Sequence, residues 1–317
     1  MNIQKILVPV DFSKFSYQAL ENALLWGEKF NAELTLLHVN TLFHEHFNYE
    51  TMVHDCQEII DKQEEHLHQL MGEQAEEIRD KQVNIQYQIL RGRSAAGAIL
   101  KFISEHHFDL IVIGTHGRTG LSHFLLGSVA EKVARLSPVP VLTIHHSVER
   151  VDIKNILVPI DFSNYSGPLV KCAISVGKAF SASLHLLYVH ERATAASFKW
   201  MVEEIEPQFE TEHYLKDQIF KKMSSYLENE TDNVIMADIK VGHPYQEIIN
   251  YADENEIDLI MMATRGFGKF DYFWLWGSTT ERVIRLATCP LLTTRHEEVS
   301  QLSETEFAEK PDSSELS

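Results

Sequence analysis

The chain has 317 residues, of which 44% are hydrophobic. That is enough for two ordinary domains with cores of their own, so a wholly disordered chain is excluded. The formal net charge of −18 at pH 7 repels the phosphates of nucleic acids and of anionic membranes. No apolar run approaches the length of about 20 residues that spans a bilayer. We therefore expect neither nucleic acid nor membrane as a partner.

The first half of the chain alternates short apolar runs with helical patterns. In chain order, these predict a strand at Ile6–Val10, a helix from its N-cap Ser13 to about Phe30, a strand at Leu34–Val39, a polar helix within 51–80, a strand at Ile85–Leu90, a helix at Ala95–His106, a strand at Leu110–Gly114, a helix at Ser128–Leu136 and a strand at Val139–Ile144. Near-continuous apolar strands between helices indicate a parallel sheet covered on both faces. Five such units favour a doubly wound α/β fold.

The chain repeats itself at an offset of 150 residues. The motif ILVPVDFS near the N-terminus recurs as ILVPIDFS in the second half. Two stretches align at this offset without gaps, 4–40 with 154–190 at 16 identities in 37 positions and 127–146 with 277–296 at 10 in 20. Solenoid repeats are far shorter, so we infer that a whole domain is duplicated.

The repeat defines the expected domain organisation. We expect one domain at 1–147 and a second at 152–296, with the boundary in the polar stretch His146–Asp152. The remaining segment, 297–317, has seven acids against one lysine and no apolar periodicity. This composition predicts a disordered acidic tail.

A glycine-rich loop joins the fourth predicted strand to the following helix. It reads GTHGRTGLSHFLLGS from Gly114 to Ser128. Glycines let backbone N–H groups approach an anion, and the helix N-terminus at Ser128 favours a phosphate, to which His116 and Arg118 would add charge or hydrogen bonds. A plain turn is the alternative. The loop is neither a Walker A motif nor a G-x-G-x-x-G fingerprint.

The spacing Gly114-x2-Gly117-x9-Gly127-Ser128 resembles the G-2x-G-9x-G-(S/T) signature of ATP-binding universal stress proteins. The segments ILVPVDFS, LLHV and SPVPVL are similar to the same family. The resemblance covers both halves of the chain and leaves out only the acidic tail. The sequence therefore resembles a tandem, E-type-like member of that family.

The resemblance implies two flavodoxin-like domains (adenine nucleotide α-hydrolase-like), each with a five-stranded parallel sheet in the order 3-2-1-4-5. Doubly wound sheets bind ligands at the carboxyl ends of strands where the winding direction reverses. In this order the reversal lies between the first and fourth strands, whose ends are Asp11 and Gly114. The signature residues therefore fall where the fold predicts a ligand.

Carried over to this sequence, the resemblance implies ATP in the first domain. Asp11 would contact the ribose and the backbone of Val39 would recognise adenine, whereas the alternative for Asp11 is a turn carboxylate beside Ser13. The implied nucleotide-binding residues are Pro9, Asp11, Val39, Ile113, Gly114, Gly117, Gly127, Ser128, Val129 and Ala130. We expect Mg²⁺ only as the companion of ATP.

The corresponding loop of the second domain departs from the signature. Ala263 stands where the first glycine should be, and ten residues instead of nine separate Gly266 from Gly277. The stretch 270–276 is rich in aromatic residues. Two readings stay open: this domain is structural, or its pocket takes another, more apolar ligand. We predict weak or no ATP binding there.

Histidine and cysteine side chains are possible metal ligands. His44, His46 and His54 are of types that suit zinc, but their spacing matches no compact zinc motif, so we predict no metal site. The three cysteines are isolated in the sequence and no signal peptide precedes the first strand. This fits a reducing compartment, and we expect a cytoplasmic protein.

No catalytic centre is predicted. The sequence has no G-x-S-x-G elbow and no set of nucleophile, base and orienting acid. Three hypotheses follow: a nucleotide-binding regulator of the stress-response type; a scaffold in which the two domains form an internal pseudo-dimer through Val139–Ile144 and Leu291–Thr294; or a slow ATPase or autokinase. Pairing of two chains into a homodimer stays open.

Overall fold

The computed structural model describes residues 2–41, 55–78, 83–115, 127–145, 152–191, 211–227, 235–264 and 278–294. The predicted domain boundary lies mostly outside these ranges, and the acidic tail lies entirely outside them. Both therefore stay predictions. Among the described helices, none combines the length and the apolar character needed to cross a bilayer.

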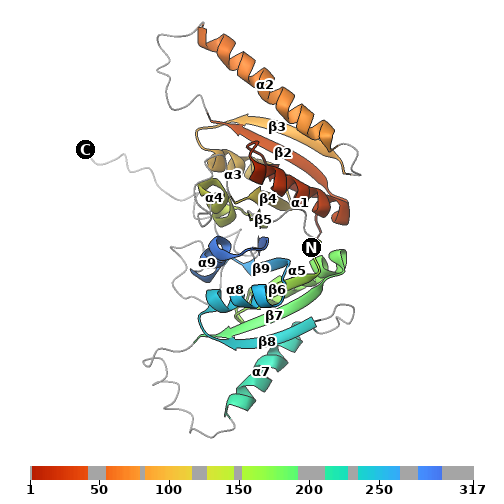
Figure 1. The fold of residues 1–317 in the computed structure, drawn as a ribbon, viewed down its shortest axis with the longest axis vertical. Coiled ribbons are helices and arrows are strands. Elements are labelled where there is room, and N and C mark those ends of the chain that lie inside the picture. Colours follow the sequence, from red (N-terminus) through yellow and green to blue (C-terminus); the bar gives the residue numbers. More distant parts are fainter. Residues whose placement is uncertain are drawn as a thin grey trace, which may run out of the picture.

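Ten strands form one continuous sheet (Figure 1). They are β1 (Lys5–Pro9), β2 (Glu33–Asn40), β3 (Ile85–Arg91), β4 (Leu110–Gly114), β5 (Val141–Ile144), β6 (Asn155–Ile160), β7 (Ser183–His190), β8 (Ile235–Val241), β9 (Leu259–Ala263) and β10 (Leu291–Thr294). Their order across the sheet is β3-β2-β1-β4-β5-β10-β9-β6-β7-β8. Each half therefore has the order 3-2-1-4-5, which confirms the predicted fold class.

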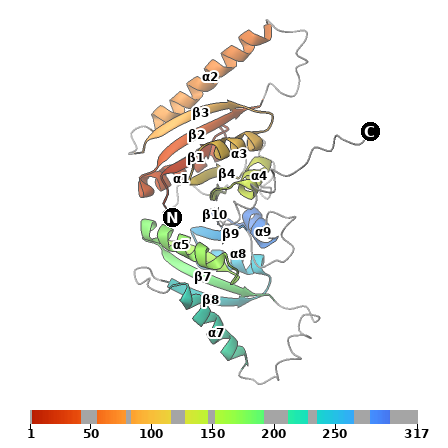
Figure 2. The ribbon, with the colours of Figure 1, turned by 180° about the vertical axis from the view of Figure 1, so that it is seen from behind.

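Eight helices are described, and they cover both faces of the sheet (Figures 1 and 2). They are α1 (Lys14–Phe30), α2 (Asp55–Glu77), α3 (Ala95–Glu105), α4 (Ser128–Leu136), α5 (Ser166–Phe180), α7 (Thr211–Ser225), α8 (Pro244–Glu254) and α9 (Ser278–Leu286). The core that contains buried residues of α1, α2, α5 and α7 lies on one face. The core that contains those of α3, α4, α8 and α9 lies on the other.

The strands are apolar on both sides because each side faces a layer of helices. In β1, Ile6 and Val8 belong to the first core and Leu7 belongs to the second. All three side chains are fully buried. This alternation across a doubly covered sheet explains why the sequence shows continuous apolar runs instead of an alternating pattern.

The start of β5 differs from the prediction. We expected a strand from Val139, but it begins at Val141. Ser137 both donates its hydroxyl to the Val139 carbonyl (2.7 Å) and accepts the Val139 N–H (3.1 Å), which holds a local turn. Pro140 cannot donate to a ladder, although its carbonyl still accepts the N–H of Ile111 (3.0 Å). The predicted start was therefore wrong by two residues.

The two domains meet edge to edge through β5 and β10, which pair antiparallel. The hydroxyl of Thr143 donates to the carbonyl of Leu291 (3.1 Å), and that of Thr293 donates to the carbonyl of Val141 (3.3 Å). The predicted pairing of these strands within one chain is thus present. It leaves β3 and β8 as the outermost strands of the sheet.

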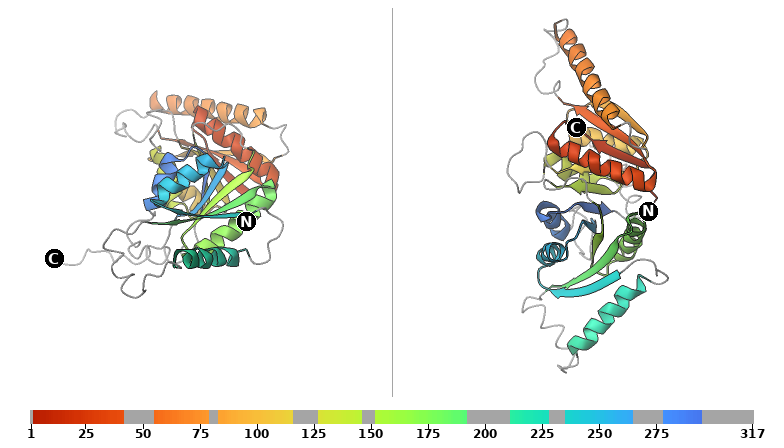
Figure 3. Two further views of the ribbon diagram at one scale, coloured as in Figure 1. Left: turned by 60° about the horizontal axis from the view of Figure 1, so that its bottom comes forward. Right: turned by 45° about the vertical axis from the view of Figure 1, so that its right-hand side comes forward.

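A second contact between the domains lies where α1 and α5 face each other (Figure 3). The rings of Trp26 and Phe180 lie 5.1 Å apart between centroids, and Phe30 approaches Phe180 at 6.3 Å. Trp26 is only 1% exposed. The two halves therefore share one continuous apolar core on this face of the sheet.

Candidate functional site

The end of β1 forms the first wall of the candidate site. After Pro9, the carboxylate of Asp11 accepts the N–H of Ser13 (3.0 Å), and Phe12 takes a left-handed φ of 62°. Ser13 then caps α1, and its hydroxyl oxygen accepts the N–H of Ser16 (3.2 Å). Asp11 thus makes the turn that was its alternative role, and it also lines the cavity described below.

The end of β4 comes very close to the start of α1. A Cβ placed on Gly114 would lie 2.7 Å from the carbonyl oxygen of Phe15, which is backbone and has little freedom to move. Any side chain at this position would push the start of α1 away. The structure therefore gives Gly114 a role in packing β4 against α1, in addition to its place in the glycine signature.

The amino end of α4 forms the opposite wall. Gly127 is its N-cap and supplies no side-chain cap, and the Gly127 N–H donates to the carbonyl of Thr115 (2.6 Å). The first-turn N–H groups of a helix carry partial positive charge and favour anions. This end of α4 is consequently suited to a phosphate or carboxylate.

These segments enclose a cavity of about 460 Å³. Nine of the ten sequence-predicted residues line it: Pro9, Asp11, Val39, Ile113, Gly114, Gly127, Ser128, Val129 and Ala130. Gly117, His116 and Arg118 lie outside the described residues. The cavity sits at the carboxyl ends of β1 and β4, where the strand order reverses and doubly wound sheets bind ligands.

Other lining residues were not predicted from the sequence. They include Ser16, His38, Asn40, Thr41, Gln63, Leu67, Ala95 and Ile99. Gln63 and Leu67 on α2, like Ala95 and Ile99 on α3, are spaced four apart and so share a helix face. This spacing is readable in the sequence, but it does not reveal which strand end the helix face covers.

His38 is a buried wall of this cavity. Its Nδ1 lies 2.8 Å from the carbonyl oxygen of Val10, so this nitrogen carries a proton. Its ring packs against Phe12 at 4.8 Å between centroids. Tyr188 occupies the corresponding place in the second domain, where it packs against Phe162 at 4.8 Å. His38 therefore ties the end of β2 to the turn that carries Asp11.

The second domain has a smaller cavity, of about 150 Å³, at the matching place. Its lining includes Asp161, Ser163, Ser166, Ala263 and Thr280. The hydroxyl of Thr280 donates to the carbonyl of Ala263 (3.1 Å). The predicted loop glycines of this domain lie outside the described residues.

The turn before α5 differs from the turn before α1. Helix α5 begins at Ser166, two residues later than the counterpart of Lys14 would place it. The Ser166 hydroxyl donates to the carboxylate of Asp161 (3.1 Å), whereas the equivalent Ser16 donates to the carbonyl of Ser13 (2.9 Å). In the second pocket, the carboxylate of Asp161 therefore accepts a hydrogen bond from the side chain of Ser166.

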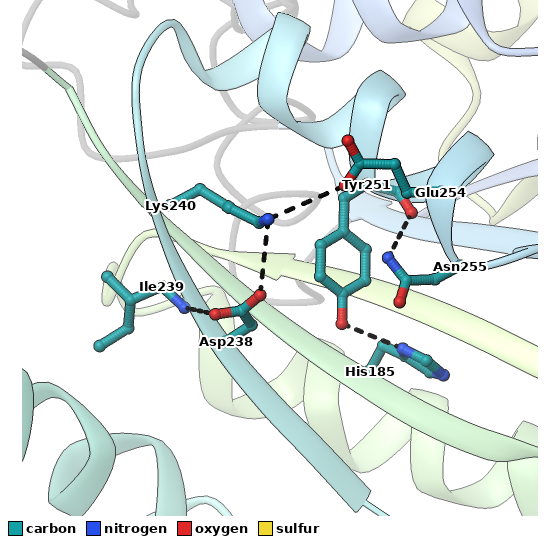
Figure 4. Close-up of polar contacts among 7 residues, drawn as sticks. All are labelled: His185, Asp238, Ile239, Lys240, Tyr251, Glu254 and Asn255. Carbon is teal, nitrogen blue, oxygen red and sulfur yellow. Dashed lines mark hydrogen bonds and ion pairs between the residues drawn. The ribbon is translucent and has the colours of Figure 1, made fainter.

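A polar group apart from both cavities lies under α8 (Figure 4). The Tyr251 hydroxyl lies 3.1 Å from Nδ1 of buried His185, and Lys240 bridges Asp238 (3.9 Å) and Glu254 (3.8 Å). Burial lowers the pKa of His185, which favours the neutral ring. The arrangement packs α8 on the sheet.

Within the described ranges, no group of three or more His, Cys, Asp and Glu side chains is placed to hold a metal ion. His44, His46 and His54 lie outside those ranges. Burial raises the pKa of Cys172 to about 11 and that of Cys289 to about 12, so both thiols stay protonated at neutral pH. Neither is an activated nucleophile.

Two similar sequences each match one domain's length of the chain. The universal stress protein MJ0531 of Methanocaldococcus jannaschii is 31% identical over 146 residues, which cover 44% of this chain and 81% of the relative. The universal stress protein YxiE of Bacillus subtilis is 31% identical over 145 residues, which cover 44% of this chain and 97% of the relative.

Two solved structures match almost the whole chain. A universal stress protein from Archaeoglobus fulgidus aligns with a TM-score of 0.65 and 24% identity, over 92% of this chain and 96% of that one. A putative universal stress protein from Pseudomonas aeruginosa aligns with a TM-score of 0.66 and 16% identity, over 97% of this chain and 98% of that one. At these identities the two structures support the tandem fold alone.

The sequence model of the Universal stress protein family matches the chain twice, at residues 2–145 and 152–295. The two matches follow the 150-residue repeat and the two halves of the ten-stranded sheet. The chain therefore belongs to the Universal stress protein family, as a tandem of two family domains.

Proposed function

We propose that this protein is a nucleotide-binding regulator of the stress-response type that binds ATP in its first domain. The observation that carries the proposal is the 460 Å³ cavity, in which nine predicted residues from separate segments converge at the switch point of the sheet. The cavity also has an anion-favouring helix end without a side-chain cap.

In this proposal each wall of the cavity meets one part of the nucleotide. Asp11 binds the ribose, the backbone of Val39 recognises the adenine edge, and Gly114 lies along the phosphates, where Gly117 of the glycine signature is also expected. The phosphates lie at the amino end of α4, beside Ser128. We assign no protein ligands to Mg²⁺. It would therefore enter the site only with the phosphates of ATP.

We propose a different role for the second domain, which is structural or takes another ligand. Its cavity is about a third as large, and the carboxylate of Asp161 already accepts the Ser166 hydroxyl. A ribose hydroxyl would compete with Ser166 for the Oδ1 atom of Asp161. One nucleotide site per chain is therefore the expected stoichiometry.

A scaffold role is the second candidate, and the continuous ten-stranded sheet favours it. In that case ATP would only stabilise the first domain and would change no other surface. A slow ATPase is a third candidate, for which sustained ADP production that is abolished by Gly117→Asp would be required. We also propose a cytoplasmic location, since Cys289, one of the described cysteines, is a buried free thiol.

The test is calorimetric titration of the full chain with ATP. We expect one site per chain, and an Asp11→Asn variant should bind at least about tenfold more weakly because a charge-assisted hydrogen bond to the ribose is lost. The matched variant Asp161→Asn should leave the affinity unchanged. Two equal sites, or no ATP binding at all, would overturn the proposal.

A further inference from the structure

Helix α2 supplies an outer wall to the first cavity. Gln63 and Leu67, one turn apart, both line it. Leu67 is 7% exposed and Gln63 is half-buried, so the first packs against the protein while the second stays partly accessible at the cavity wall. Of the described side chains of α7, the corresponding helix of the second domain, none lines the smaller cavity.

The wall is held in place from two sides. Met71, one turn beyond Leu67, is fully buried in the core of the first domain. At the cavity end, Glu64 forms an ion pair with Arg91 at the end of β3. The hydrogen bond and charge of Arg91 hold the pKa of the Glu64 carboxyl below its usual value. The pair is partly exposed, at 57% for the Arg91 side chain and 29% for that of Glu64, and it links the helical turn that carries Gln63 to the end of β3.

The described residues of the second domain do not repeat this ion pair. Arg91 is the partner of Asn40 in the register of β2 and β3, and the equivalent pair of β7 and β8 is His190 with Val241. Val241 has no charge, and it is 50% exposed. The ion pair is thus a feature of the domain with the larger cavity.

The position of α2 indicates which part of a bound nucleotide would lie nearest to this helix. Helix α4 packs beside β5, and α2 packs on β3, so the two helices flank opposite ends of the cavity along the sheet (Figure 1). A nucleotide with its phosphates at α4 extends across β4 and β1 toward β2. Its base would then reach the part of the cavity that Val39 and Gln63 both line.

We propose that Gln63 is a base-recognising residue of the nucleotide site, and that Arg91 is a positioning residue which holds Gln63 through Glu64. The amide of Gln63 carries a donor and an acceptor, which suits the polar edge of a base, and Leu67 offers an apolar surface to its ring. This inference rests on the proposed nucleotide function and adds a recognition element to it.

The first experiment separates a base contact from a phosphate contact. In the full chain, Gln63→Leu should weaken ATP, ADP and AMP by the same factor, roughly 3- to 10-fold, because the three share the base. Gln69→Leu is the matched control: Gln69 lies on the exposed side of the same helix, where it donates to Glu73 (2.8 Å), and its loss should leave all affinities unchanged. Unchanged affinities in Gln63→Leu, or a loss that grows with the number of phosphates, would overturn the role of Gln63.

The second experiment tests the positioning role by charge exchange. Arg91→Glu and Glu64→Arg should each weaken the three nucleotides roughly 2- to 5-fold, and the double exchange should recover the affinity. Lys101→Glu, which breaks the exposed pair of Lys101 with Glu105 (3.7 Å), should have no effect. Absence of recovery would overturn the positioning role, whereas a wild-type chain that binds no adenine nucleotide would overturn the proposed function itself.

Discussion

At the residue scale, Gly114 and its counterpart Ala263 mark the difference between the domains. Glycine signatures are usually explained by close approach of backbone to phosphate. Here the nearest obstacle to a side chain at Gly114 is the carbonyl of Phe15, at 2.7 Å. The glycine thus sets the distance between β4 and the turn that carries Asp11, and it shapes the cavity before any ligand arrives.

We expect Gly114→Ala to destabilise the protein by about 1–3 kcal/mol, because overpacking against backbone forces α1 to move. ATP affinity should fall at least about tenfold, since the turn at Asp11 moves with α1. Gly97→Ala is the control, because a Cβ there meets nothing closer than 3.6 Å, and it should be neutral or stabilising by up to about 1 kcal/mol. Urea unfolding and calorimetry measure both variants. Full ATP affinity in Gly114→Ala would refute the steric role.

His185 makes stability depend on pH. Its pKa is lowered in the folded protein, so the unfolded chain takes up this proton first as the pH falls. Stability from this group is complete above the unfolded pKa of about 6.5 and is lost as the pH falls below it. We expect His185→Asn to show a shallower loss of unfolding free energy between pH 7 and 5. Tyr251→Phe, which keeps the titrating ring, should retain the slope.

At the element scale, the ends of the helices explain where the two domains diverge. Helix α5 begins late at Ser166, and Pro168 gives a physical reason. If the helix began at Asn164, Pro168 would fall beyond its first turn and the carbonyl of Asn164 would lack its N–H partner. The late start frees Ser166 to bind Asp161. Pro168, the third residue of α5, thus alters the pocket of the second domain at the carboxyl ends of its strands.

The carboxyl ends of α1 and α5 provide a matched stability test. Both caps are left-handed, with φ of 52° at Asn31 and 57° at Ser181. Asparagine tolerates this conformation and serine does so less well. We expect Ser181→Gly to stabilise the protein by about 1 kcal/mol and Asn31→Gly to do so by less. Urea unfolding measures both, and an equal or reversed order would contradict this account.

Much of the fold was predictable from the sequence, and parts of the site were not. Apolar runs such as Leu110–Gly114 mark buried strands without tertiary information, and the family resemblance supplied their order. The carboxyl ends of the strands then placed Asp11 and Gly114 together. Gln63 was not predictable, because a polar residue in a polar helix is assigned to a cavity only once the packing of α2 on β3 is known.

At the scale of the whole molecule, the two domains share a sheet and a core. Pairing of β5 with β10 and the contact of Trp26 with Phe180 join them on the sheet edge and on one face. Neither domain can lose its fifth strand without exposing the edge of the other. We therefore expect the chain to unfold as one cooperative unit.

This cooperativity has a test that uses the proposed ligand. ATP at 100 times its Kd should stabilise the folded chain by about 2.7 kcal/mol, and the whole transition should shift even though only the first domain binds. Differential scanning calorimetry with and without ATP measures this. Two transitions, of which ATP moves only one, would show that the domains unfold independently.

The antiparallel junction of β5 and β10 has a consequence for how the protein diverged. In an assembly of two identical subunits, every substitution appears in both pockets at once. Here the partner of the first domain is a different segment of the same chain, so its residues can change independently. The covalent linkage keeps this partner at a high effective concentration. The second domain can then change residues such as Ala263 and Pro168 and still supply the strand that completes the sheet. Covalent linkage thus lets one copy change its pocket without changing the pocket of the other.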